Sequence, residues 1–225
     1  PAHHFPTGSV MPIRRRQDLL DWAGRQERRY IIEDDYDSEF RFTGRPIPPM
    51  QTMDRRGRVI YINSFSKSIS PAIRISYMVL PPQLMERFQR DLGFYACTVS
   101  SFEQYTLARF MGEGYFEKHL ARMKKRYRTQ RNELIALLRQ EPLGKRLRIL
   151  EKDAGLHFLL AVDTVLSDRA LTEGLGALGV KVRCLSDYYH GPGPRPEHCL
   201  VVNYTGVTQS GAQRLRQALE QVLGE

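Results

Sequence analysis

Lys67 lies in a short, hydroxyl-rich run that offers an amine nucleophile together with groups that could hold an anion. The run Ser64-Phe65-Ser66-Lys67-Ser68 follows an apolar stretch, and Arg74 comes soon after it. A lysine on a rigid turn can form a Schiff base with an aldehyde cofactor. Hydroxyls, backbone N–H groups and an arginine can hold a phosphate group. The alternative is a plain surface loop, because serine- and lysine-rich loops are common.

A second segment could supply the rest of such a site. The β-branched run ending at Ile32 leads directly into Glu33-Asp34-Asp35-Tyr36-Asp37. In open α/β sheets, ligand-binding groups come from the carboxyl ends of strands. Asp34 and Tyr36 are two positions apart, so a strand continuing through both would present them on one face. Pyridoxal phosphate (PLP) needs a carboxylate at its pyridine nitrogen, and it gains from a phenol beside its 3′ oxygen.

A divalent-metal site is the alternative interpretation of the acidic segment, since carboxylates bind Mg²⁺. No nucleotide-phosphate loop accompanies these carboxylates. Taken together, the acidic segment and the lysine turn favour PLP over a metal.

Five runs resemble the fold type I aminotransferases and, more narrowly, the GabR-like aminotransferase domain of MocR-type regulators in the GntR superfamily. These runs are Phe5–Gly8, Ile32–Phe40, Ser64–Ser68, Arg74–Pro82 and Ala154–Phe158. The resemblance covers essentially the whole chain. It implies an α/β fold: the rest of a large PLP-dependent transferase domain, with a mixed, mainly parallel sheet and flanking helices, plus a small α+β C-terminal domain.

The same resemblance implies a role for each residue of the site. Lys67 would hold PLP as an internal aldimine, Asp34 would pair with the pyridinium nitrogen, and Tyr36 would hydrogen-bond the 3′ oxygen. The phosphate ligands would be Ser64, Ser66 and Arg74. Phe5 stands where ordinary aminotransferases carry an asparagine, and MocR-type domains share that difference.

Recognition of the ligand's carboxylate differs from that in the enzymes. Aminotransferases usually carry a carboxylate-binding arginine in the last strand of the small domain, and Val201 aligns with that position. In GabR-like domains the arginine comes from the end of the preceding strand, where Asp187 aligns. Arg183 and Arg195 are nearby candidates, although each could equally be a surface arginine. Asp187 would suit a ligand that carries a second amine or hydroxyl groups.

The resemblance therefore implies the effector-sensing, PLP-binding domain of a bacterial MocR/GntR-type transcriptional regulator. An amine or amino-acid effector would exchange with Lys67, and regulation rather than turnover is expected. A catalytically active fold type I aminotransferase is the main alternative, and a PLP-free dimerisation scaffold is a third. The chemistry of a lysine that binds PLP does not by itself distinguish an effector-sensing domain from an active aminotransferase.

The chain starts at Pro1, so we expect it to begin inside a domain and to be truncated at its N-terminus. The missing part would hold a winged helix-turn-helix and some of the cofactor pocket. Whether this fragment retains PLP is therefore left open. We expect a cytoplasmic homodimer that contacts DNA only through the missing domain.

Composition limits the other functions. The net charge of +9 could indicate nucleic-acid binding, but the basic residues cluster only between Arg122 and Arg131, where they are expected on the solvated face of a helix. Cys97, Cys184 and Cys199 have no metal-ligand spacing and are expected to be buried thiols in a reducing compartment. No metal site, membrane span or signal peptide is expected.

The elements that must position these residues alternate between helix and strand, as in a layered α/β sheet. Predicted helices cover residues 12–28, 82–92, 101–111, 116–140, 167–178 and 210–223. Predicted strands cover residues 29–33, 59–63, 75–80, 148–151, 157–162, 181–185 and 199–204. A loop rich in proline, glycine and arginine is expected over residues 43–58. We assign residues 1–115 to the large domain and residues 116–225 to the small one.

Overall fold

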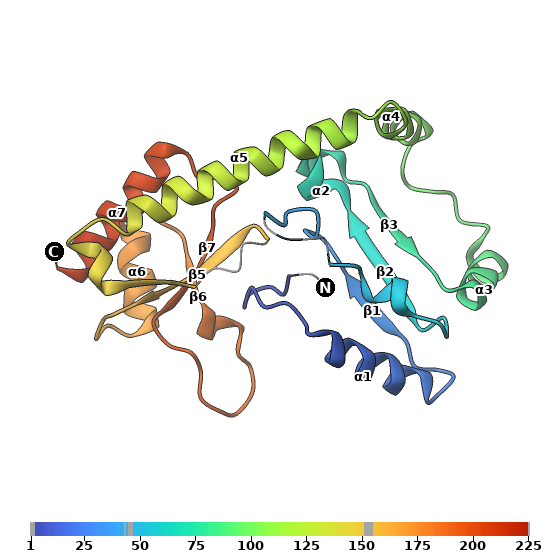
Figure 1. Ribbon diagram of the computed structural model, residues 1–225, viewed down its shortest axis with the longest axis horizontal. Coiled ribbons are helices and arrows are strands. Elements are labelled where there is room, and N and C mark those ends of the chain that lie inside the picture. The colour runs from blue at the N-terminus through green and yellow to red at the C-terminus, as the bar shows by residue number, and fades with distance from the viewer. Residues whose placement is uncertain (1–2, 43, 45–46, 151–154, 225) are drawn as a thin grey trace. The chain divides into compact units, whose positions relative to one another are not determined.

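The computed structural model describes residues 3–42, 44, 47–150 and 155–224 and divides into two compact units (Figure 1). Unit 1 comprises Pro1–His3 and Val10–Met123, and unit 2 comprises His4–Ser9 and Lys124–Glu225. The division between residues 123 and 124 falls within a long helix. The domain boundary after residue 115 stays a prediction.

Unit 1 is built on a mixed three-stranded sheet. Its strands are β1 (Ile31–Asp34), β2 (Val59–Ser64) and β3 (Ser76–Val79), in the order β1-β2-β3. β1 and β2 are parallel, whereas β3 runs antiparallel to β2. Because parallel strands share a direction, the carboxyl ends of β1 and β2 lie at the same edge of the sheet.

Short helical segments connect and flank these strands. They are α1 (Ile13–Gly24), η1 (Met50–Met53), α2 (Phe65–Ser68), η2 (Pro71–Ile73), α3 (Pro82–Leu92) and α4 (Ser101–Gly112). Pro82 starts α3, as expected for a residue that lacks a backbone donor. Ser100 and Glu103 form a capping box at the start of α4. None of the residues of β3, α3 or α4 is buried.

Unit 2 contains an antiparallel four-stranded sheet, in the order β4-β5-β7-β6. The strands are β4 (Leu147–Leu150), β5 (His157–Val162), β6 (Arg183–Cys184) and β7 (Cys199–Asn203). The helical segments are the part of α5 (Tyr115–Leu138) from Lys124 onward, η3 (Leu143–Arg146), α6 (Asp168–Ala177), η4 (Leu185–Tyr188) and α7 (Gln209–Leu223). Ser167 and Thr208 cap α6 and α7 with their side chains.

Apolar residues of this sheet form much of the core of unit 2. Cys184 pairs with Leu200 across β6 and β7, and Leu160 pairs with Leu200 across β5 and β7. All three side chains are fully buried. Directly paired residues share a face of the sheet, so these three side chains lie on the same face. Leu171 of α6 and Leu219 of α7 are likewise fully buried.

The predicted elements agree with these in kind, but several boundaries differ. The first helix ends at Gly24, four residues early, and the strand expected over residues 181–185 shortens to two residues. The helix α2 was not predicted. Thr43, Glu151 and Ala154, which belong to predicted segments or motifs, lie outside the described residues.

Two side-chain predictions were wrong. Cys97 is exposed, whereas Cys184 and Cys199 are buried as expected. Cys97 lies in the loop between α3 and α4, neither of which buries a side chain. Arg131 was assigned to a solvated helix face but is buried, and its guanidinium donates to Asn132 Oδ1.

Among the described residues, no helix is long and apolar enough to cross a membrane.

Candidate functional site

The acidic segment and the lysine turn leave the sheet of unit 1 at one edge. Asp34 is the last residue of β1 and pairs with Ile62 of β2, while the Asp35 N–H donates to the Ile62 carbonyl at 2.9 Å. Ser64 ends β2 two residues later and begins the turn into α2. The parallel pairing therefore brings Asp34 close to the start of the lysine turn, as the sequence predicted for the strand ends.

The lysine turn is anchored on both sides of its amine. Phe65 and Ser68 are buried, whereas Lys67 between them is exposed. The Phe65 N–H donates to the Ile75 carbonyl at 3.0 Å, which ties the start of α2 to the residue that precedes β3. The Phe65 ring also contacts the Tyr77 ring, with centroids 5.5 Å apart. Lys67 thus projects from a fixed backbone, which covalent attachment of a cofactor requires.

Arg74 has an uncommon backbone conformation. Its φ of 51° and ψ of 28° lie in the left-handed region, which few residues other than glycine adopt. The buried Ile75 follows it, and the Ser70 side chain caps the preceding turn by accepting from the Ala72 N–H at 3.2 Å. Strained backbone of this kind is concentrated at functional sites. The guanidinium of Arg74 is exposed.

Tyr36 lies in a turn and not on a strand as expected. β1 ends at Asp34, so Tyr36 lies in the turn that follows, and the argument from a shared strand face was wrong. Burial, followed by the charges of Asp37 and Asp34, raises the pKa of Tyr36 above its ordinary value. The phenol is therefore neutral near pH 7 and able to donate a hydrogen bond.

A partly buried polar network that the sequence did not reveal joins the two turns. The Asn63 side chain donates to Tyr61 Oη at 3.1 Å and to Glu39 Oε1 at 3.5 Å, and it accepts from the Ser64 N–H at 2.6 Å. Tyr61 Oη in turn donates to Asp35 Oδ2 at 3.0 Å. The polar residues that interrupt the apolar strand over residues 59–64 were the available signal. This network supports the backbone of both turns.

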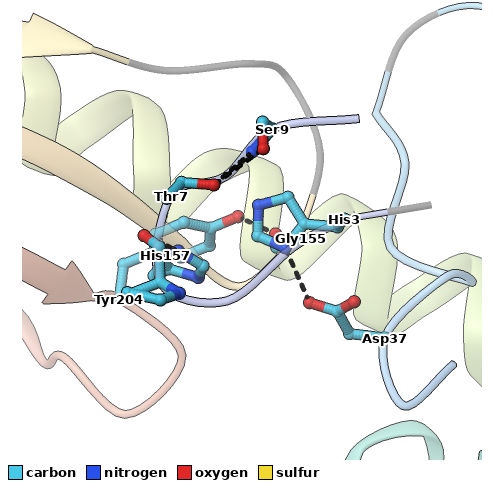
Figure 2. A network of polar contacts seen from close by, with 8 residues as sticks. His3, Thr7, Ser9, Asp37, Gly155, His157 and Tyr204 are labelled. Atoms are coloured by element: carbon cyan, nitrogen blue, oxygen red, sulfur yellow. Dashed lines mark hydrogen bonds and ion pairs between the residues drawn. The ribbon is translucent and has the colours of Figure 1, made fainter. Parts of the chain in front are cut away.

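The remaining acidic residues serve the structure rather than a ligand. Glu33 accepts from the backbone N–H groups of Met50 and Gln51, at 2.7 and 2.9 Å. Figure 2 shows His3 turned toward Asp37, with Nδ1 3.1 Å from Oδ2 and both side chains buried. Among Glu33, Asp34, Asp35 and Asp37, only Asp34 is exposed.

Five exposed or half-buried groups near this edge fit the chemistry of PLP. They are one amine, one carboxylate, two hydroxyls and one guanidinium, carried by Lys67, Asp34, Ser64, Ser66 and Arg74. Among the described residues, no side-chain hydrogen bond or ion pair engages any of these five groups. Their types match an aldehyde, a pyridine nitrogen and a phosphate. In the same described part of the chain, no group of three or more His, Cys, Asp or Glu residues could hold a metal ion.

The three weaker candidates for ligand contacts lie in unit 2. Arg183 pairs with Val201 across β6 and β7, so it flanks the position that the missing arginine would occupy. It also lines a cavity of about 630 Å³. Asp187 accepts from the Cys184 N–H at 3.2 Å and so helps to hold η4. Arg195 is exposed in the loop before β7, and neither it nor Asp187 lines the cavity.

Sequence comparison identifies a family and several regulators. The family model "Aminotransferase class I and II" matches residues 3–219. The chain is 40% identical to the HTH-type transcriptional regulator YhdI of Bacillus subtilis, covering 97% of the chain and 46% of that protein. It is 37% identical to the probable rhizopine catabolism regulatory protein MocR of Rhizobium meliloti, covering 97% and 44%. The chain thus spans about half the length of these curated relatives.

Solved structures similar to this chain include aminotransferases. Kynurenine aminotransferase of Pyrococcus horikoshii, solved in complex with PMP, is 26% identical, with a TM-score of 0.76 over 97% of this chain and 54% of that one. Aminotransferase Aro9 of C. albicans is 16% identical, with a TM-score of 0.79 over 97% and 54% of the two chains. At that lower identity the likeness shows the fold alone.

Proposed function

The chain belongs to the class I and II aminotransferase family, and from this premise we propose that it is the effector-sensing, PLP-binding part of a MocR/GntR-type transcriptional regulator. The regulators YhdI and MocR support this assignment, because their similarity extends over almost the whole chain. PLP is supported by the aminotransferase fold and by the PMP complex of the kynurenine enzyme.

A single observation carries the proposal. Asp34 and Ser64 end neighbouring parallel strands, and Lys67 projects from the helical turn that follows Ser64. A carboxylate and a lysine amine therefore leave one edge of a sheet, where α/β folds bind their ligands. Bound PLP would supply an aldehyde and an electron-poor ring.

We assign the roles as follows. Lys67 would bind the aldehyde covalently, Asp34 would pair with the protonated ring nitrogen, and the neutral Tyr36 would donate to the 3′ oxygen. The phosphate ligands would be Ser64, Ser66 and Arg74. An effector amine or amino acid would take the place of the Lys67 amine, which would free that side chain. Such an exchange can shift the balance between two conformations of a sensing domain.

The partners follow from the regulators that the chain resembles. We propose that the full-length protein is a cytoplasmic homodimer that binds DNA through a helix-turn-helix domain, as the names of its relatives suggest. Arg183, Asp187 and Arg195 remain candidates for contacts with the effector.

An active aminotransferase is the second candidate, and the solved enzymes with this fold favour it. Assays of full-length protein with an amino acid and a keto acid distinguish the two. We expect a single exchange of the bound amine without sustained turnover. Continuous product formation that Lys67→Ala abolishes would establish the enzyme instead.

The role of Lys67 has a direct spectroscopic test. Full-length protein is expected to show a visible absorbance band when purified with PLP, and Lys67→Ala should abolish that band. Lys145→Ala removes an exposed lysine that pairs with Glu141 in unit 2, and it should leave the band intact. A band of unchanged position and intensity in the Lys67→Ala protein would refute the attachment.

A further inference from the structure

Asn63 occupies a central position among the polar groups on one face of the unit 1 sheet. Strand β2 places Tyr61 and Asn63 on the same face, and Tyr77 of β3 pairs directly with Asn63. The Asn63 side chain is almost fully buried, at 3% exposed. A buried amide needs an acceptor for each N–H and a donor for its oxygen, and Asn63 has all three.

A single backbone group fixes the direction of these hydrogen bonds. The Ser64 N–H can only donate, so the atom 2.6 Å from it is the amide oxygen of Asn63. The amide nitrogen therefore donates to Tyr61 Oη at 3.1 Å and to Glu39 Oε1 at 3.5 Å. Tyr61 Oη in turn donates to Asp35 Oδ2 at 3.0 Å. The bonds thus run in one direction, from the start of the lysine turn to the Asp35 carboxylate.

The ionisation of Tyr61 agrees with this direction. Burial, opposed in part by the hydrogen bond from Asn63 and supported by the charge of Asp35, raises the pKa of Tyr61 above its ordinary value. The phenol therefore keeps its proton at neutral pH and can donate a hydrogen bond. The Asp35 carboxylate that accepts it is 4% exposed, and a buried carboxylate needs such donors.

The two ends of this chain of bonds adjoin the residues proposed to bind PLP. Asp35 directly follows Asp34, the last residue of β1. Ser64 ends β2 and precedes α2, the helical turn that carries Lys67. A displacement of the Asn63 amide would therefore reach both strand ends.

We propose that Asn63 is a positioning residue of the cofactor site, acting through Tyr61 and Ser64 without touching the cofactor. The proposal rests on the function proposed above, because it requires PLP at Lys67. The Asn63 amide would fix the Asp34 carboxylate and the Lys67 amine relative to each other, and both must reach one cofactor. Side chains behind a site commonly hold its ligand-binding groups in place in this way.

The test measures the dissociation constant of PLP from the absorbance band of full-length protein, well below the unfolding temperature of each variant. Asn63→Leu removes all three hydrogen bonds at similar volume, and Tyr61→Phe removes one phenol oxygen while it keeps the ring. Both should weaken PLP binding about tenfold or more. Tyr105→Phe removes a phenol that is 77% exposed in the same unit, and it should have no effect.

An exchange of donor and acceptor provides a rescue experiment. Asn63→Asp can still accept from the Ser64 N–H, but it cannot donate to Glu39 and adds a negative charge beside it. Adding Glu39→Gln places the donor on the other partner and restores the total charge. The double variant should bind PLP more tightly than Asn63→Asp alone. Thermal unfolding of the same proteins without PLP records any change in the stability of the fold.

Failure of this proposal is distinguishable from failure of the proposed function. A band that survives Lys67→Ala would refute both. A band that depends on Lys67, with unchanged PLP affinity in Asn63→Leu and Tyr61→Phe, would overturn the positioning role alone. So would losses of thermal stability without a loss of PLP affinity, because the network would then serve only the fold. Tyr61→Phe decides the result if Asn63→Leu does not fold.

Discussion

Glu39 is a half-buried residue, and only one of its two carboxylate oxygens has a hydrogen-bond partner among the described residues. Its Oε1 atom accepts from Asn63 at 3.5 Å, while Oε2 is buried without a hydrogen-bond partner among the described residues. Burial, opposed in part by a backbone hydrogen bond and supported by the charge of Asp35, raises the pKa of Glu39. The charged form is therefore disfavoured in the folded protein.

Glu39→Gln should consequently stabilise the protein at neutral pH. A carboxyl with a raised folded pKa contributes stability below its unfolded pKa and loses it as pH rises through the folded value. Removing the ionisable group should thus raise the unfolding free energy at pH 7. The gain should disappear near pH 4. Thermal unfolding at both pH values measures it, and equal gains at both would contradict the assignment.

Arg74 allows the backbone and the side chain to be tested separately. Arg74→Gly and Arg74→Ala both remove the guanidinium, but only glycine adopts the left-handed conformation without cost. The glycine variant should therefore be more stable than the alanine variant by about 1 kcal/mol. Both should bind PLP more weakly than the parent protein. Equal stability of the two variants would show that the φ of 51° carries no strain.

At the scale of single residues, the sequence indicated which exposed side chains could bind a cofactor, but it did not indicate which buried side chains contact one another. Lys67 and Asp34 were recognisable because their types and neighbours suit a cofactor. His3 and Asp37 were not, because they lie 34 residues apart and only the fold brings them together. Asn63 was missed because a polar residue that interrupts an apolar strand indicates a polar contact without identifying its partners.

Among the elements, η1 depends on one side chain of β1. Glu33 accepts from two backbone N–H groups of η1 and is almost fully buried. Glu33→Ala would leave both donors without that acceptor and should cost about 2–4 kcal/mol. Asp34→Ala, the exposed neighbour on the same strand, should change stability by less than about 0.5 kcal/mol in protein without PLP. Urea unfolding of both variants distinguishes them, and equal losses would refute the structural role of Glu33.

Periodicity predicted the kind of each long element more reliably than its ends. The strand over residues 157–162 was predicted at its observed bounds, because a continuous apolar run marks it. The strand at residues 181–185 was predicted too long. Leu185 instead begins η4, whose turn Asp187 holds through the Cys184 N–H. Tertiary contacts of this kind leave no signal in hydrophobic periodicity.

At the scale of the whole molecule, unit 1 exposes many large apolar side chains. They include Tyr77, Met78, Val79, Met85, Phe88, Leu92, Phe94, Tyr95, Phe102 and Tyr105. Large exposed apolar surfaces on a single chain are associated with interactions or with aggregation. The fold class was predictable from the alternation of elements, whereas this exposure required the structure.

The 225-residue chain in isolation should therefore self-associate and bind a hydrophobic dye. Replacing Phe94 and Tyr105, which are 76% and 77% exposed, with serine should reduce dye fluorescence and the apparent mass in light scattering. Val165→Ser alters a fully exposed apolar residue of unit 2 and serves as the control. An unaltered mass in the double variant would exclude this surface as the cause.

The segment His4–Ser9 belongs to unit 2 although it is followed by most of unit 1. His157 Nε2 donates to the Pro6 carbonyl at 2.9 Å, and the Phe5 ring packs against the rings of His157 and Tyr188. Unit 2 is thus assembled from two separate stretches of polypeptide. Cleavage within α5 would yield a C-terminal fragment of unit 2 that lacks the segment His4–Ser9. A synthetic hexapeptide with the sequence of His4–Ser9 should bind that fragment and stabilise its fold.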